Sequence, residues 1–268
     1  MTRTHSPSAL NASLIHEFCR DLSWISQVDI VEHTESTNAD LMLEAARSGE
    51  DGQILVAETQ TRGRGRRGRA WLMEPYRDLA FSMLLRPQVS PDKYPLISFE
   101  FGLAIYDALR EFCGTELSLK WPNDLLLGGL KVAGMLSESM PPTPTAPGTV
   151  VVGVGINLNS RGESMDPELR STTTSIALHS GQEVDRTLIL KKILKSLDNR
   201  RQGMERGSVD VEAWNRHAAW IGQKVVVQED GKKREGTFLG ILPDGSMRLQ
   251  EAAGSERHII CGDVVRLA

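Results

Sequence analysis

The stretch with the clearest chemistry is an arginine–glycine segment at residues 61–69 (TRGRGRRGR), where five arginines alternate with three glycines. Arginine presents a rigid fork of donors that matches carboxylate and phosphate oxygens. Glycine lets backbone N–H groups approach the same anion without a Cβ in the way. Because the like charges repel and no apolar side chain anchors the loop, we expect it to be mobile alone and ordered around a polyanion. From this segment alone, a solvated basic loop or an RNA-binding tract is an equally good interpretation.

The composition of the whole chain favours a small anionic ligand. The 268 residues carry a net charge of −4, so the arginines are a local exception on a mildly acidic body. This length predicts about two domains, or one large domain with an appendage. Cys19, Cys113 and Cys261 are far apart and show no metal-ligand spacing, as is typical of reduced thiols in a cytosolic protein. No apolar run reaches membrane-spanning length and residues 1–7 lack a signal peptide's apolar segment, so we expect a soluble cytoplasmic protein.

Polar residues also gather where a helix is expected to begin. Ser36 or Thr37 is the predicted N-cap of an amphipathic helix that ends at Gly49, and with Thr37 as the cap Asp40 occupies the N3 position. Capping alone explains Ser36, Thr37 and Asn38. The functional interpretation is that their hydroxyl, amide and N–H groups form a small site for a polar ligand.

Apolar segments predict the sheet and helices that must position these residues. Residues 150–159 are a predicted strand buried on both faces, in which Gly153 and Gly155 would allow a ligand or another backbone to approach closely. Trp71 and Leu72 are expected to lie in a strand as well. The other predicted strands of this region are 29–33, 54–58 and 79–85, and the predicted helices are 13–23, 95–112, 185–201 and one beginning at 208.

A hairpin is predicted over residues 117–138, with Gly128 and Gly129 at its turn. It carries the charged residues Lys120, Asp124 and Lys131. Pro122 inside the first strand implies a bulge or an edge position there. Asp124 has a purely structural alternative as the ion-pair partner of either lysine.

From Ile221 onward, short strands separated by glycine-containing turns predict a small all-β barrel of SH3 type. The regular spacing of the strands is the basis of this prediction. We place the domain boundary near Trp220, giving domains 1–220 and 221–268. The predicted strands are 224–228, 236–242, 246–250, 257–261 and 264–267.

Taken together and in order, these features resemble the biotin protein ligases closely. Each motif alone is weak or moderate, but the combination is highly specific, and the resemblance runs from about Val31 to the C-terminus. Arg62 departs from the family pattern, which usually has a small residue before the loop's first glycine. The matching segments are Glu35–Asn38, Gln60–Arg69, Lys120–Asp124, Lys131–Leu136 and Gly153–Asn157.

The resemblance implies an α+β fold, a mixed β-sheet catalytic domain with helices packed on it, followed by the small SH3-like barrel. It also implies two half-reactions. Biotin and ATP give biotinyl-5′-AMP and pyrophosphate, and the biotinyl group then passes to one lysine of the biotin carboxyl carrier domain of an acyl-CoA carboxylase. A carboxylate that attacks a phosphate brings two anions together, so the site needs fixed cations. Arg64, Arg66, Arg69 and Lys131 can supply them, with Mg²⁺ for the leaving pyrophosphate.

The family match also implies roles for individual residues. Lys131, Asp124 and Arg66 are the expected catalytic residues, with Lys131 bridging the biotin carboxylate and the α-phosphate and Asp124 orienting or deprotonating the acceptor lysine. Trp71 is expected to stack on adenine and Asn157 to bond its edge. Apart from the family match, Trp71 and Trp121 could both be core aromatics, and we favour that interpretation for Trp121 rather than for Trp71. Biotin is expected to bind Ser36, Thr37, Asn38, Gln60, Gly63, Arg64, Gly65, Arg66, Lys131, Gly134, Leu136, Gly153 and Gly155. ATP and the adenylate are expected to bind Arg66, Arg67, Arg69, Trp71, Lys131 and Asn157, and no residue is assigned to a metal.

Two other functions remain open at this stage. A lipoate–protein ligase shares the fold and chemistry and differs in the acyl pocket, although the arginine–glycine run and Lys120–Asp124 favour biotin. An RNA-binding protein would use the arginine tract and the terminal barrel. About thirty residues precede the first motif, too few for the winged helix-turn-helix of repressor-type ligases, so we expect a monofunctional ligase without DNA binding, as a monomer or weak homodimer.

Overall fold

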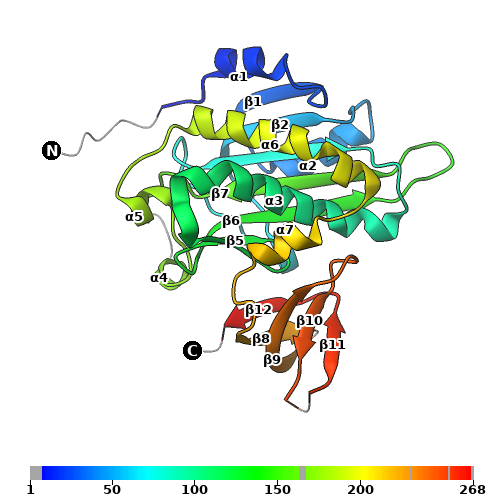
Figure 1. Ribbon diagram of the computed structural model, residues 1–268. Coiled ribbons are helices and arrows are strands. Elements are labelled where there is room, and N and C mark those ends of the chain that lie inside the picture. Colours follow the sequence, from blue (N-terminus) through cyan, green and yellow to red (C-terminus); the bar gives the residue numbers. More distant parts are fainter. Residues whose placement is uncertain (1–7, 163–166, 230, 253, 267–268) are drawn as a thin grey trace.

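A seven-stranded mixed sheet forms the centre of the larger part of the chain, in the order β1-β2-β3-β7-β6-β5-β4 (Figure 1). The computed structural model describes residues 8–162, 167–229, 231–252 and 254–266. Strands β1 and β2 pair in parallel, and the other neighbouring strands pair antiparallel. The predicted mixed sheet of an α+β fold is therefore confirmed. The strands are β1 (Gln27–Thr34), β2 (Gln53–Gln60), β3 (Leu79–Leu85), β4 (Leu117–Lys120), β5 (Asp124–Leu127), β6 (Leu130–Met140) and β7 (Thr149–Ile156).

Helices cover both faces of this sheet, which is why its central strands are almost continuously apolar. Helices α3 (Tyr94–Cys113) and α6 (Arg186–Arg206) lie side by side over one face, with α1 (Ala12–Cys19) beside α6 (Figure 1). Helix α2 (Thr37–Ala45) packs on the other face through Leu41 and Ala45. All of β3 is buried, and β7 is buried but for a half-buried Gly153, as predicted for the latter.

Helix α3 lies within one residue of its predicted limits, whereas α6 extends five residues beyond its predicted end at Arg201. Helix α6 begins at an Asp185 N-cap whose side chain accepts the amides of Thr187 and Leu188. Helices α1 and α2 end four residues earlier than the predicted limits at Ser23 and Gly49. The short helices α4 (Pro167–Arg170) and α5 (Ile176–Ser180) were not predicted, and α7 (Val211–Arg216) begins after the predicted start at 208.

The prediction of one continuous strand over residues 117–127, with a bulge or an edge position at Pro122, is wrong, although β4 does lie at the edge of the sheet. Strands β4 and β5 are antiparallel to each other, with Lys120 opposite Asp124, so Trp121–Asn123 forms a turn. Pro122 has no N–H to give to a ladder and occupies that turn. Trp121 is in the core as expected, because its ring is buried and its indole N–H donates to the Gly245 carbonyl at 3.0 Å. The hairpin at Gly128-Gly129 is confirmed as the β5–β6 connection.

A second, five-stranded antiparallel sheet follows, in the order β11-β10-β9-β8-β12. The predicted SH3-like architecture fits it, although the outer strands β11 and β12 do not pair within the described residues, so no barrel closes. Leu267 of the predicted last strand lies outside those residues, and the boundary at 220/221 stays a prediction. The strands are β8 (Lys224–Glu229), β9 (Lys232–Ile241), β10 (Met247–Gln250), β11 (Glu256–Ile259) and β12 (Asp263–Arg266).

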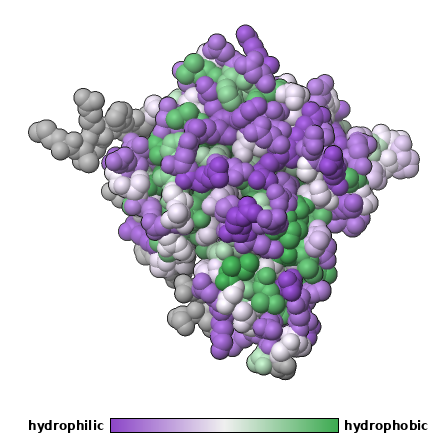
Figure 2. All heavy atoms as spheres, viewed as in Figure 1, coloured by the Kyte–Doolittle hydropathy of each residue, from purple (hydrophilic) through white to green (hydrophobic). Residues whose placement is uncertain are grey.

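The face of the molecule in Figure 2 is mostly hydrophilic over the helices of the larger domain. Hydrophobic residues gather lower in the view, where that domain meets the C-terminal sheet. Among the described residues, no helix is both long and apolar enough to cross a membrane.

Candidate active site

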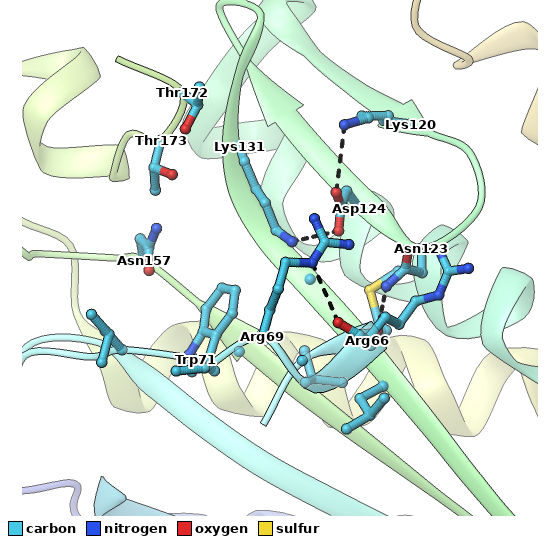
Figure 3. Close-up of a pocket in the computed structure, with 18 of the residues that line it drawn as sticks. Arg66, Arg69, Trp71, Lys120, Asn123, Asp124, Lys131, Asn157, Thr172 and Thr173 are labelled. Atoms are coloured by element: carbon cyan, nitrogen blue, oxygen red, sulfur yellow. Dashed lines mark hydrogen bonds and ion pairs between the residues drawn. The ribbon is translucent and has the colours of Figure 1, made fainter. Parts of the chain in front are cut away.

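A cavity of about 550 Å³ lies where the end of β2, the β5–β6 hairpin and the end of β7 meet the arginine–glycine loop (Figure 3). Strand β12 of the C-terminal sheet contributes to its wall, so both parts of the chain build it. The lining residues are Ser36, Thr37, Asn38, Gln60, Arg64, Gly65, Arg66, Arg69, Ala70, Trp71, Leu72, Lys120, Asn123, Asp124, Leu126, Gly129, Leu130, Lys131, Gly134, Met135, Leu136, Gly153, Val154, Gly155, Asn157, Leu169, Ser171, Thr172, Thr173, Trp220, Val264 and Val265.

One end of the cavity is a buried network of neutral polar groups. The Gln60 side-chain oxygen accepts the Thr37 backbone N–H at 2.9 Å and the Thr37 hydroxyl lies 3.1 Å from it. The same hydroxyl is 2.6 Å from that of Ser82, which donates to Asn38 Oδ1 at 2.6 Å. Ser36 is the N-cap by backbone geometry but its side chain makes no capping bond, so capping does not account for these residues. Their bonds fix donors and acceptors at the cavity wall.

Asn38 links this network to a carboxylate. Its Nδ2 donates to the Leu136 carbonyl at 3.1 Å and to Glu138 Oε2 at 2.9 Å. Arg64 donates to the same Glu138 oxygen at 3.1 Å. The Asn38 side chain fits here because Gly153 has no Cβ, which would lie 2.1 Å from Asn38 Oδ1. The close approach that Gly153 permits is therefore that of a neighbouring site residue.

The arginine–glycine loop folds on itself through backbone hydrogen bonds. Gly65 N–H donates to the Arg69 carbonyl at 2.7 Å, and Trp71 N–H donates to the Gly63 carbonyl at 2.8 Å. This local pairing replaces the strand expected at Trp71 and Leu72. Arg62, which departs from the family pattern, forms an exposed ion pair with Glu35 at 3.2 Å. The predicted mobility of the loop stays a prediction.

Three arginines of the loop converge on one carboxylate of the C-terminal sheet. Asp263 lies 3.4 Å from Arg66, 3.7 Å from Arg67 and 3.1 Å from Arg69. Arg66 also donates to Asn123 Oδ1 at 3.1 Å, and Figure 3 shows both side chains beside the cavity. Burial lowers the pKa of Arg66, an effect that the nearby Asp263 opposes. The guanidinium group stays charged because its ordinary pKa is so high.

Lys131 and Asp124 form the tightest ion pair of the cavity, with Nζ and Oδ1 2.6 Å apart. Lys120 lies 3.8 Å from the other oxygen of Asp124, so this carboxylate faces two ammonium groups (Figure 3). Burial lowers the pKa of Lys120, Asp124 raises it, and Lys131 lowers it further. Room for the Lys131 side chain exists because a Cβ on Gly134 would lie 2.8 Å from its Nζ.

Trp71 packs against β7, the strand that Asn157 follows. A Cβ on Gly155 would lie 2.1 Å from Trp71 Cε2, so this ring position depends on that glycine. Lys131 Nζ lies 5.5 Å from the centre of the Trp71 ring. The Trp71 indole N–H is buried without a hydrogen-bond partner among the described residues. Asn157 Nδ2 donates to the Thr174 carbonyl at 3.1 Å.

The cavity brings together every predicted site residue except Gly63 and Arg67. Gly63 pairs with the Trp71 backbone behind the loop, and Arg67 points to Asp263. Their binding roles, like those of the other site residues, stay predictions. Sequence reasoning missed Asn123, Ser82 and Glu138 as supporting groups, along with Asp263. The available signal was a polar residue interrupting an apolar strand, as Ser82 does in β3.

Sequence comparisons place this arrangement among known proteins. The profile of the biotin/lipoate A/B protein ligase family matches residues 30–157, and that of the biotin protein ligase C terminal domain matches residues 220–267. The biotin–[acetyl-CoA-carboxylase] ligase of Mycobacterium tuberculosis is 32% identical over 247 residues, covering 90% of this chain and 89% of that protein. The chain belongs to the biotin protein ligase family. The Paracoccus denitrificans protein of the same name is 34% identical over 234 residues, covering 85% of this chain and 95% of the relative.

A solved structure of the biotin protein ligase family has the same fold. The biotin protein ligase from Aquifex aeolicus, in complex with biotin and ATP, superposes with a TM-score of 0.74 at 27% identity. The match covers 90% of this chain and 98% of that chain, so it includes both sheets.

Proposed function

We propose that the chain activates biotin with ATP to form biotinyl-5′-AMP and transfers the biotinyl group to a lysine of a carrier domain. One observation carries this proposal. A single cavity holds a buried network of neutral donors and acceptors at one end and a set of cations at the other. A substrate with a neutral polar ring and an ionised tail that reacts with a triphosphate needs both the neutral network and the cations.

The neutral end suits the ureido ring of biotin. Thr37, Asn38 and Gln60 are held by mutual hydrogen bonds and by Ser82, so their remaining donors and acceptors have fixed directions. A ligand that leaves these buried groups unmatched loses their hydrogen bonds and their solvation. This end of the cavity therefore favours a polar ring over an apolar one of the same size.

The cationic end suits the reacting carboxylate and phosphate. Lys131 Nζ lies 5.5 Å from the centre of the Trp71 ring and lines the same cavity as the neutral network, so we assign it to contact the biotin carboxylate and the α-phosphate together. Arg66 and Arg69 add positive charge from the loop, and their fixed positions reduce the repulsion between two approaching anions. The adenine ring would stack on Trp71, whose unpartnered indole N–H offers a donor to the nucleotide.

Mg²⁺ would accompany the triphosphate. Among the described residues that line the cavity, Asp124 is the one acidic side chain, and both of its oxygens already face lysines. These ligands fit an ion held mainly by phosphate oxygens. When bound, the ion offsets negative charge on the leaving pyrophosphate. The described residues contain no cluster of three or more histidine, cysteine or acidic side chains that would hold a metal by itself.

In the transfer step the acceptor lysine must arrive neutral. Asp124 is the carboxylate at the reacting end and is held there by Lys131 and Lys120, so we assign it to orient or deprotonate the incoming amine. The names of the relatives support an acetyl-CoA carboxylase as the source of the acceptor. The acceptor is then the biotin carboxyl carrier domain of that enzyme.

The decisive experiment incubates the purified chain with labelled biotin, ATP, Mg²⁺ and a carboxyl carrier domain. We expect label on one lysine of the carrier and none when that lysine is replaced by arginine. A parallel reaction with labelled lipoate in place of biotin tests whether the chain is a lipoate–protein ligase instead. Preferential transfer of lipoate, or no biotin-dependent ATP–pyrophosphate exchange, would refute the proposal.

A further inference from the structure

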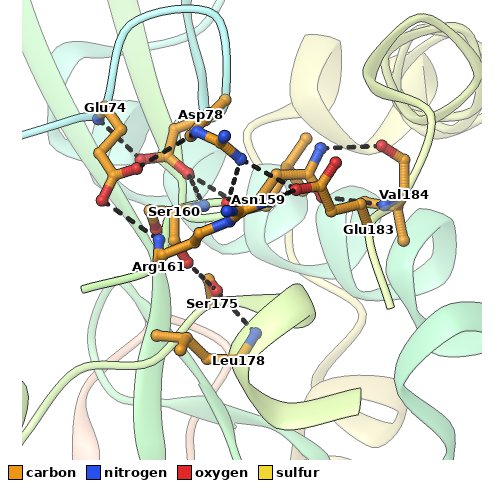
Figure 4. A network of polar contacts seen from close by, with 11 residues as sticks. Glu74, Asp78, Asn159, Ser160, Arg161, Ser175, Leu178, Glu183 and Val184 are labelled. Atoms are coloured by element: carbon orange, nitrogen blue, oxygen red, sulfur yellow. Dashed lines mark hydrogen bonds and ion pairs between the residues drawn. The ribbon is translucent and has the colours of Figure 1, made fainter. Parts of the chain in front are cut away.

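A cluster of buried polar groups outside the cavity joins the loop after Trp71 to the segment after Asn157 (Figure 4). Asp78, the residue before β3, is only 1% exposed. Its Oδ1 accepts the backbone N–H groups of Leu158 at 3.0 Å and Ser160 at 3.2 Å. Its Oδ2 accepts the N–H of Glu74 at 2.9 Å. A carboxylate this deeply buried is tolerated because three donors satisfy it.

Ion pairs close the solvent side of the same cluster. Arg77 and Arg161 both lie 2.9 Å from Glu183 Oε1. Arg77 also donates to the Asn159 carbonyl at 3.4 Å, and Arg161 N–H donates to Glu74 Oε1 at 3.1 Å. Each of the two segments therefore donates hydrogen bonds to the other, as Figure 4 shows.

The segment held by Asp78 leads directly to the nucleotide end of the cavity. Asn157 donates its backbone N–H to the Val132 carbonyl at 2.9 Å and its side-chain amide to Thr174. Thr174 N–H in turn donates to the Lys131 carbonyl at 2.9 Å. The residues at the ring end of the cavity bond to other groups, chiefly Ser82 and Glu138. The Asp78 carboxylate therefore bonds to the segment that carries Asn157, and its hydrogen bonds within the described residues include none to the ring-end residues Thr37, Asn38 and Gln60.

We propose that Asp78 is a positioning residue for nucleotide binding. By holding residues 74 and 158–160 together, it sets the spacing between Trp71 and Asn157, the two residues expected to contact adenine. Asp78 does not line the cavity, so it acts through these two residues. The inference rests on the proposed function, because it assumes that the nucleotide binds at this end.

The charge state of Asp78 offers a way to separate positioning from general stability. Burial raises the pKa of Asp78 to about 6, while the hydrogen bonds from Glu74, Leu158 and Ser160 lower it. Near neutral pH the side chain is mainly ionised and acts only as an acceptor. Arg186 of α6 donates to the Asp78 carbonyl at 2.8 Å and pairs with Glu58 of β2. The charged groups around it are Glu58, Glu74, Arg77, Arg161, Glu183 and Arg186.

The test compares Asp78→Asn with Glu100→Gln, a matched change at another buried carboxylate. Glu100 lies on α3, away from the cavity lining, and likewise accepts a backbone N–H, that of Asp210 at 2.7 Å. In biotin-dependent ATP–pyrophosphate exchange, Asp78→Asn should raise the KM for ATP about tenfold, because a misplaced contact weakens binding. Biotin affinity measured by calorimetry without ATP should stay within about twofold, and Glu100→Gln should change neither quantity by more than about twofold.

The pH profile supplies the readout that a merely structural role would not move. The ratio of the two KM values for ATP, variant over wild type, should fall toward one between about pH 7.5 and about pH 5.5, because acid neutralises the wild-type carboxylate. An unchanged KM for ATP, equal weakening of both ligands, or a ratio that does not vary with pH would overturn the proposal.

A second variant keeps the inference testable if Asp78→Asn does not fold. Arg77→Met removes the ion pairs with Glu183 and Glu74 and the hydrogen bond to the Asn159 carbonyl, and it leaves Asp78 in place. It should raise the KM for ATP about threefold with biotin affinity unchanged. An unaltered KM for ATP in this variant would count against the proposal. Failure of the proposed function looks different, since the wild-type chain would then show no biotin-dependent exchange at all.

Discussion

Replacing Gly155 by alanine should selectively weaken nucleotide binding. The added Cβ would lie 2.1 Å from Trp71 Cε2 and 2.4 Å from Nε1, far inside van der Waals contact. Gly155 pairs with Ala80 on one side and Gly134 on the other, in the middle of the sheet, so the strand cannot move away. The Trp71 ring must leave its place instead. Stacking of a base on an aromatic ring contributes about 1–3 kcal/mol, which corresponds to roughly a 5- to 150-fold rise in the KM for ATP.

Gly153 provides the matched control, two residues away on the same face of the same strand. A Cβ there would lie 2.1 Å from Asn38 Oδ1 and would displace that side chain from Ser82 and Leu136. Gly153→Ala should therefore weaken biotin binding, by about 5- to 30-fold if one or two hydrogen bonds of about 1 kcal/mol each are lost.

The assay is biotin-dependent ATP–pyrophosphate exchange at varied ATP for Gly155→Ala, together with calorimetric titration of biotin into each variant. Opposite selectivity is expected, with Gly155→Ala affecting ATP and Gly153→Ala affecting biotin. The reasoning is refuted if Gly155→Ala keeps the wild-type KM for ATP, or if both variants weaken the same ligand to the same extent. Thermal unfolding of both proteins checks that the sheet has survived the substitutions.

Three further predictions concern charged groups. Lys131→Ala should lower adenylate formation by about 10²–10³-fold, because a fixed cation at the developing charge is lost, and exchange activity within tenfold of wild type would remove Lys131 from the reaction. Arg66→Gly should leave the fold intact and release the adenylate, measured as biotin label on bystander proteins, whereas Arg257→Ala, an exposed arginine of β11, should release none. The folded-state pKa of Asp78, raised to about 6, lies above the ordinary value, so its contribution to stability is present at acidic pH and lost as pH rises through 6. Relative to Asp78→Asn, the free energy of unfolding should therefore fall by roughly 2 kcal/mol between about pH 4 and about pH 7, and a flat difference in chemical denaturation would contradict this.

The long, strongly patterned elements could be predicted from sequence alone. Helix α3 and strand β7 agree with their predicted ranges within a few residues, because local periodicity determines both. The turn at Trp121–Asn123 could not, since the segment is apolar on both sides and Trp121 is buried like a strand residue. Its burial depends on the Gly245 carbonyl, more than a hundred residues away in the sequence.

The cavity could be predicted only in part, because some of its residues lie in local motifs and others come from distant segments. Lys131, Asn157 and the residues near Thr37 lie in motifs that sequence can reveal. Their supporting partners are single polar residues in distant segments, such as Ser82 inside an apolar strand. Asp263 is another, because its position depends on how the C-terminal sheet packs against the larger domain. A contact set by packing between distant segments leaves no local pattern.

Asp263 occupies the arginines that an incoming anion would need, so the anion would have to take the place of this carboxylate. Three guanidinium groups share this one carboxylate, so the loop keeps more positive than negative charge before any substrate arrives. If the triphosphate binds at these arginines, as the proposed function implies, it replaces one acidic side chain as the partner of three cations that the fold already holds together. That replacement would loosen the contact between the arginine–glycine loop and β12, so we expect phosphate binding to be coupled to this contact.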